Sequence, residues 1–262
     1  MKRSAWNKFI IARDRYRLAV EEITGIAPNL AKFQQKLADG RTDKGGAVQG
    51  YKVETPVVYN RALDEITVGD EIRLILVADN PGRREQAAEN RRYLVGPSGK
   101  IAEKFFNNNP ALGIDFRKNT IILNKTPIHT PRTVELRELC RLEALTGKRT
   151  IEKALEESQR TMAALLLEFH KALYTGGDND LQIWIIGYSE MKKGGIFSVY
   201  TDEVRQLYSE AGSEMMERLF LFRHFSMNQF TIDLNQQKKP AETTEKALRR
   251  IGSAYRQRIL GF

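Results

Sequence analysis

The chain has 262 residues, 41% of them hydrophobic and 29% charged, and its net charge is +9 at pH 7 with the three histidines neutral. This composition is typical of one large α/β domain with extensions, and it excludes a chain that is disordered throughout. No apolar run reaches the roughly 20 residues that a membrane helix needs, and the first residues carry no apolar segment followed by a small-residue cleavage site. We therefore expect a cytoplasmic protein.

Taken in chain order, apolar residues recur near helical spacing over 6–23 and 30–37, which predicts a helical N-terminal arm. The glycine-rich segment 39–50 predicts a flexible loop. Strands and helices then alternate, as in parallel α/β folds. Strands are predicted over 72–77, 120–123, 181–186 and 220–222, and helices over 99–106, 134–145, 151–173, about 203–219, and 242–259.

These elements predict an α/β fold, a three-layer α/β/α sandwich with a central, mainly parallel four-stranded sheet. The predicted organisation is a helical extension with the glycine-rich loop (1–60), an α/β domain (61–235) and a basic C-terminal helix (236–262) packed on the same domain.

The positive charge is unevenly distributed along the chain. The net charge is +5 over residues 1–51, +4 over 83–118 and +6 over 218–262, and the two intervening segments are each −3. Clustered Lys and Arg favour a polyanion such as DNA as the partner, because phosphate contacts supply most non-specific affinity. The alternative is that these residues only solvate helix faces.

Three predicted strands each deliver one polar residue to their carboxyl end. The first ends in the turn Asn80-Pro81-Gly82 and an Arg-rich loop, and two later strands lead to Asn124 and His224. In an open α/β sheet such ends line the ligand crevice. We therefore expect Asn80, Asn124 and His224 to converge on one small polar ligand.

In order and spacing, these motifs resemble those of the uracil-DNA glycosylase superfamily over about residues 72–229. The segment Ala78-Asp79-Asn80-Pro81-Gly82 is similar to the Asn-Pro-Gly version of its first motif, and His224-Phe225-Ser226 is similar to its His-Pro-Ser motif with Phe225 in place of proline. The segment from Tyr93 to Lys100 is similar to the Pro-Phe-Val-Gly-x-Ala-Gly segment of the iron–sulfur branches, and Leu123-Asn124 to the strand-end Asn that reads uracil. A cysteine-ligated cluster is excluded, because Cys140 is the only cysteine.

The resemblance implies a monofunctional DNA glycosylase that hydrolyses the N-glycosidic bond of uracil or a related deaminated base in DNA. His224 would be a neutral donor near uracil O2 that stabilises the anionic leaving group. The carbonyl oxygen of Asn80 would orient a water against the sugar. Asp79 could instead supply a carboxylate, but neighbouring strand residues point to opposite faces, which favours Asn80. The amide of Asn124 would read O4 and N3–H of uracil.

The remaining roles concern the flipped base and the DNA backbone. Tyr93 is the candidate platform for base stacking, although a strict match to the segment would place Leu94 there. Phe225 or Met227 would wedge into the duplex. The expected DNA contacts are Arg83, Arg84, Arg91, Arg92, Ser98, Lys100, Ser226 and Met227. We expect a monomer acting on uracil-containing or mismatched DNA, without metal or cofactor and away from membranes.

Each motif also has a plainer interpretation. Asn80-Pro81-Gly82 is a common turn, and His224 alone suits a structural histidine. His129 lies in a proline-punctuated loop and is predicted at the surface or at a helix entry, and His170 lies within a long helix. Two other functions stay open: a non-catalytic nucleic-acid-binding descendant, indicated by the departures at Phe225 and Leu94, and an enzyme of free bases or nucleosides.

Overall fold

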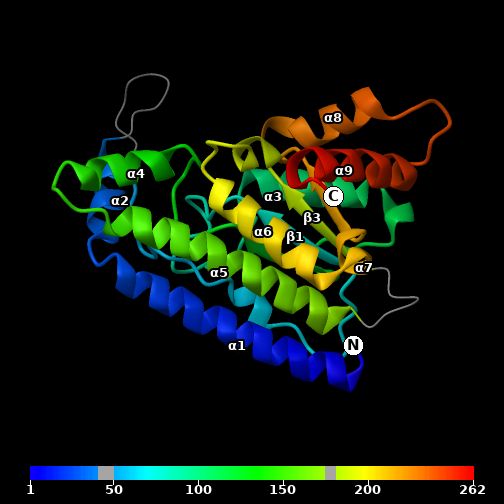
Figure 1. The fold of residues 1–262 in the computed structure, drawn as a ribbon, viewed down its shortest axis with the longest axis horizontal. Coiled ribbons are helices and arrows are strands. Elements are labelled where there is room, and N and C mark those ends of the chain that lie inside the picture. The colour runs from blue at the N-terminus through cyan, green and yellow to red at the C-terminus, as the bar shows by residue number, and fades with distance from the viewer. Residues whose placement is uncertain (41–49, 175–180) are drawn as a thin grey trace.

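The computed structural model describes residues 1–40, 50–174 and 181–262, and most of the predicted loop over 39–50 lies outside them. The described part has a central sheet with helices on both faces (Figure 1). The four strands are parallel in the order β2-β1-β3-β4. The predicted three-layer α/β/α sandwich is therefore confirmed. The strands are β1 (Leu74–Ala78), β2 (Thr120–Asn124), β3 (Gln182–Ile186) and β4 (Leu219–Phe222).

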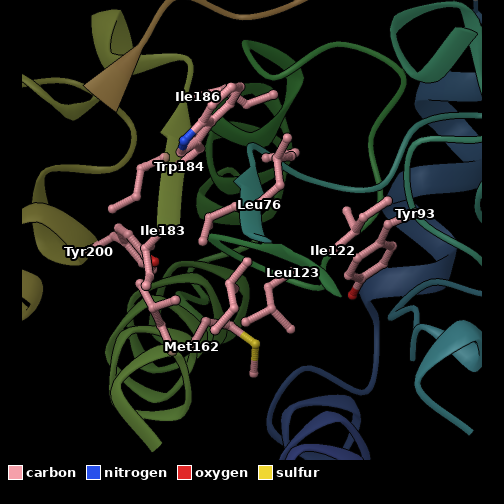
Figure 2. Close-up of a cluster of buried hydrophobic side chains, with 14 of the residues drawn as sticks. Leu76, Tyr93, Ile122, Leu123, Met162, Ile183, Trp184, Ile186 and Tyr200 are labelled. Atoms are coloured by element: carbon pink, nitrogen blue, oxygen red, sulfur yellow. The ribbon is translucent and has the colours of Figure 1, made fainter. Parts of the chain in front are cut away.

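One face of the sheet packs against two long helices. Parallel strands covered on both faces read as continuous apolar runs, as in the sequence LILVA of β1. These helices are α5 (Thr150–Leu173) and α6 (Ser198–Ala211). Met162 of α5 and Tyr200 of α6 belong to the same core as Leu123 and Ile183 of the sheet (Figure 2).

The opposite face is covered by α3 (Pro97–Asn107), α8 (Gln229–Gln237) and α9 (Thr244–Leu260). Trp184 of β3 stacks on Phe106 and Phe230, with ring centroids 5.4 and 5.8 Å apart. Gly252 allows α9 to approach β4 closely, because a Cβ at this position would lie 2.7 Å from Phe222. The predicted helix over 242–259 corresponds to α9, which packs against β4.

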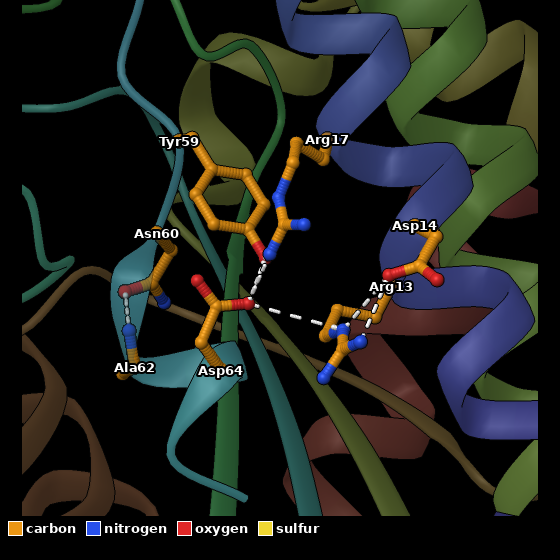
Figure 3. A network of polar contacts seen from close by, with 7 residues as sticks. All are labelled: Arg13, Asp14, Arg17, Tyr59, Asn60, Ala62 and Asp64. Atoms are coloured by element: carbon orange, nitrogen blue, oxygen red, sulfur yellow. Dashed lines mark hydrogen bonds and ion pairs between the residues drawn. The ribbon is translucent and has the colours of Figure 1, made fainter.

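The N-terminal arm belongs to the same body. Helix α1 (Arg3–Ile26) runs alongside α5 (Figure 1), and the rings of Phe9 and Phe169 lie 5.8 Å apart. Asp64 accepts hydrogen bonds from Arg17 (2.6 Å) and Tyr59 (2.7 Å) at the surface (Figure 3). Because exposed ion pairs contribute little, the apolar contacts hold the arm in place.

Two helical predictions differ from the structure. The predicted helix over 203–219 begins earlier and is broken at Gly212, whose φ of +96° ends α6 before the short α7 (Ser213–Met216). Helix α8 was not predicted. The other elements are α2 (Leu30–Asp39), η1 (Arg61–Asp64), η2 (Pro110–Leu112), α4 (Glu135–Ala144), η3 (Tyr188–Met191) and η4 (Ser226–Asn228). None of the described helices is long and apolar enough to cross a bilayer.

Candidate functional site

The carboxyl ends of the strands meet at one edge of the sheet. Ala78 and Asn124 are partners in the register of β1 and β2, so the next residues, Asp79 and Lys125, are neighbours. The Lys125 Nζ donates to Asp79 Oδ1 and to the carbonyl oxygen of Ile186, each at 2.5 Å. One buried ammonium therefore joins the ends of β1, β2 and β3.

The position of the Asp79 carboxylate depends on its neighbours. Oδ2 accepts a hydrogen bond from Thr133 Oγ1 at 3.3 Å. Gly187, with φ of +80°, leaves room for the carboxylate, because a Cβ there would lie 2.4 Å from Oδ1. The Asp79 side chain is 14% exposed, so the carboxylate is nearly buried but still reaches solvent.

Sequence reasoning missed Lys125. Its side chain is fully buried, and Nζ lies 4.9 Å from the centre of the Phe197 ring. Burial lowers the pKa of Lys125, and the Asp79 carboxylate opposes this effect. A lysine that follows a strand is ordinarily exposed. The sequence alone therefore does not indicate that Lys125 is buried, and only the strand register places it beside Asp79.

His224 follows β4 and is half-buried. Its Nδ1 accepts a hydrogen bond from the backbone N–H of Ser226 at 3.0 Å. Burial lowers the pKa of His224; the Asp79 carboxylate opposes this effect and the Lys125 ammonium adds to it. A neutral ring whose Nδ1 accepts must carry its proton on Nε2, so His224 offers one neutral donor.

Asn80 is partly committed to holding its own loop. Its Nδ2 donates to the carbonyl oxygen of Thr130 at 3.0 Å and to Thr130 Oγ1 at 2.9 Å. The amide nitrogen therefore fixes the turn against the 128–130 segment. The carbonyl oxygen is the part of the amide that is left for a ligand.

Asn124 ends β2 and is 2% exposed. Its Nδ2 has no hydrogen-bond partner among the described residues. Buried amide donors without partners are uncommon and cost about 1–3 kcal/mol. An unpaired donor of this kind suits a ligand acceptor.

The predicted stacking platform is wrong. Tyr93 is 1% exposed, and its hydroxyl donates to the Val58 carbonyl (2.6 Å) and accepts from the Tyr16 hydroxyl (2.7 Å). Figure 2 shows the Tyr93 ring within the apolar core. Leu94 is 3% exposed, and a Cβ at Gly99 would overlap its carbonyl group. Neither side chain presents a surface on which a base could stack.

The loop after His224 exposes one of the two predicted wedge residues. Phe225 is fully buried and stacks on Phe230 with centroids 4.3 Å apart, so it cannot enter a duplex. Met227 is 83% exposed and has a φ of +52°. Such a backbone is strained for a residue with a Cβ.

The predicted DNA contacts are mostly exposed. Arg83 lies over the Tyr51 ring at 5.0 Å, and Arg92 pairs with Glu65. Ser226 contributes its backbone N–H to His224. Of the other residues, Arg84 and Lys100 are exposed, and Arg91 and Ser98 are half-buried.

The other two histidines are structural. His129 is fully buried rather than at the surface, which corrects the prediction. Its Nδ1 donates to the Pro81 carbonyl at 2.8 Å, and Nε2 accepts from the Tyr51 hydroxyl at 2.9 Å. His170 is fully buried beside the Tyr208 hydroxyl, and burial lowers its pKa to about 3.

A second residue missed from the sequence is Glu85, in the Arg-rich loop. Its carboxylate accepts a hydrogen bond from the backbone N–H of Gly82 at 2.9 Å, and the backbone N–H groups of Leu94 and Val95 lie near it. Burial raises the pKa of Glu85 to about 7, although these hydrogen bonds oppose the effect. Glu85 therefore connects the two ends of the loop that follows β1.

Comparison of the chain with models of known protein families finds no match, and a search of curated proteins finds none either. The function of the site is therefore inferred from its own geometry and chemistry.

Proposed function

We propose that this protein is a DNA glycosylase that hydrolyses the N-glycosidic bond of uracil or a related deaminated base. The observation that carries the proposal is that the His224 ring is neutral and carries its proton on Nε2. Its Nδ1 is occupied by the Ser226 N–H, and burial favours the neutral ring, which leaves Nε2–H as a donor. Breaking the bond puts negative charge on the base, and a preorganised donor stabilises that charge as it develops.

Base choice would come from Asn124. Its unpaired Nδ2 is a donor for O4 of uracil, and its carbonyl oxygen is an acceptor for N3–H. Cytosine presents the inverse pattern and would leave the buried amide unsatisfied. The free-energy cost of leaving the amide unpaired therefore disfavours cytosine, and the hydrogen bonds gained with uracil add to this preference.

The sugar side of the site has two oxygen acceptors. The Asn80 carbonyl and the Asp79 carboxylate both follow β1, where a water attacking C1′ could be held. As the water oxygen bonds to C1′, the C1′–N1 bond breaks, its electron pair leaves with the base, and the water releases a proton that passes to solvent. This displacement requires no metal and no redox cofactor.

DNA binding would rest on the exposed basic residues of the loop after β1 and on Met227. Arg83, Arg84 and Lys100 are exposed, and phosphate contacts of this type make binding fall steeply with salt. The exposed Met227 suits an apolar wedge that fills the stack after the base is flipped out.

The proposal is tested with the purified protein on oligonucleotides that carry one uracil, single-stranded or opposite guanine or adenine. Alkali then cleaves the abasic sites. The matched control has cytosine at the same position. Uracil-dependent cleavage is the expected result, and cleavage no greater than a protein-free blank across salt and mismatch contexts would refute the proposal.

The second candidate is a non-catalytic nucleic-acid-binding protein of the same fold. The burial of Tyr93 and Leu94 favours it, because a flipped base then lacks the predicted platform. It predicts salt-dependent DNA binding without excision, and Asn80→Ala would leave that binding unchanged.

A further inference from the structure

The Asp79–Lys125 pair is a buried ion pair at the carboxyl ends of the strands. A fully buried lysine carries a high desolvation cost, which is tolerated only when partners compensate it. Here Lys125 contacts Asp79 Oδ1 and the Ile186 carbonyl at 2.5 Å, and Gly187 leaves room for the carboxylate. Three strand ends thus contribute to placing one carboxylate.

Two groups that follow β1 could hold a water, and they are not equivalent. Asn80 is neutral, and its nitrogen is bound to Thr130. Asp79 is charged and lies close enough to His224 to affect its pKa. A carboxylate both orients a water and interacts favourably with the positive charge that builds on the sugar, whereas an amide does only the first.

We propose that Asp79, rather than Asn80, orients the attacking water, and that Lys125 is a positioning residue that holds the Asp79 carboxylate in place. This inference rests on the proposed glycosylase function. The water oxygen bonds to C1′ as the C1′–N1 bond breaks, and its electron pair stays on the base. The proton released by the water passes to the Asp79 carboxylate and then to solvent.

Lys125 acts through Asp79 and not on the substrate. Its Nζ is fully buried, lies over the Phe197 ring, and is hydrogen-bonded to two protein oxygens. Glu190 also influences it electrostatically. Without Lys125, the Thr133 hydroxyl is the one hydrogen-bond donor to the carboxylate that remains among the described residues.

The test is single-turnover excision of uracil by the full chain and by Asp79→Asn, Lys125→Met, the double variant and Asn80→Ala. Asp79→Asn keeps the side-chain shape and should slow excision about 10²–10⁴-fold, the usual range for a group that assists proton transfer. Lys125→Met should slow it by a similar factor. The double variant should be no slower than Asp79→Asn, because the two residues act as one unit. Asn80→Ala should lose less than Asp79→Asn.

The outcomes separate this inference from the proposed function. Absence of excision by the parental protein refutes both. Excision at the parental rate by Asp79→Asn refutes the inference alone. So does a double variant in which the rate losses of Asp79→Asn and Lys125→Met multiply. A DNA adduct trapped by borohydride in the parental protein but not in Lys125→Met would also overturn it, because Lys125 would then be a nucleophile.

A second readout does not depend on activity, and it remains available where Lys125→Met excises poorly. NMR titration of the His224 ring should give a higher pKa in Lys125→Met, which removes a nearby cation, and a lower pKa in Asp79→Asn, which removes a nearby anion. An unchanged His224 pKa in both folded variants would show that the pair does not lie where the inference requires.

Discussion

Glu85 makes the stability of the protein depend on pH in a direction that is unusual for a carboxylate. Burial raises its pKa from 4.5 to about 7. Between these values the unfolded chain has released the proton while the folded chain retains it, so the folded state binds more protons and stability falls as pH rises. At 1.36 kcal/mol per pKa unit, the ionised Glu85 destabilises the folded state by about 3 kcal/mol above pH 7.

The perturbation that isolates this effect is Glu85→Gln, which keeps an acceptor for the Gly82 N–H and removes the titration. Burial lowers the pKa of His170 and His224, so these residues change stability in the opposite direction as pH rises. Urea unfolding of both proteins at pH 5, 6, 7 and 8 cancels that contribution in the difference. The parental chain should lose about 2.5 kcal/mol relative to Glu85→Gln between pH 5 and pH 8, and a pH-independent difference would refute the reasoning.

Three further substitutions test individual residues. Asn124→Asp should weaken uracil selectivity by about 1–3 kcal/mol, because a carboxylate lacks the donor for O4, and unchanged base selectivity in competition assays would remove Asn124 from the site. Met227→Ala should slow excision from duplex and leave single-stranded substrate unaffected if the side chain is a wedge; equal effects on both would contradict that role. Tyr93→Phe should destabilise the fold by about 1–3 kcal/mol in urea, because Val58 and Tyr16 lose a buried partner, while a loss of excision at unchanged stability would restore Tyr93 to the site.

The layers of the fold were predictable because they follow from hydrophobic periodicity. The apolar runs of the four strands and the long helical pattern of α5 lie where the sequence predicted them, to within a few residues. The break at Gly212 and helix α8 were not predicted. Gly212 stands within a continuous helical pattern, and α8 packs through only a few apolar residues such as Phe230 and Leu234.

The site was less predictable, because it depends on strand register and on burial. From the sequence, Asn80 was favoured over Asp79 because neighbouring strand residues point to opposite faces. The strand register places Asp79 beside Lys125, because these residues directly follow the register partners Ala78 and Asn124. No sequence pattern distinguishes this buried lysine from a solvated one. Tyr93 was assigned by motif, and only the packing of α1 shows that its hydroxyl is bonded to Tyr16 inside the core.

The most direct test of the central claim is single-turnover excision of uracil by the parental protein and by His224→Ala, with His224→Gln as the variant that retains a donor. We expect His224→Ala to slow excision about 10²–10³-fold, His224→Gln to recover part of the rate, and DNA affinity to change little. Excision at the parental rate by a folded His224→Ala variant would contradict the proposed mechanism, because the base would then leave without the donor on which the mechanism depends.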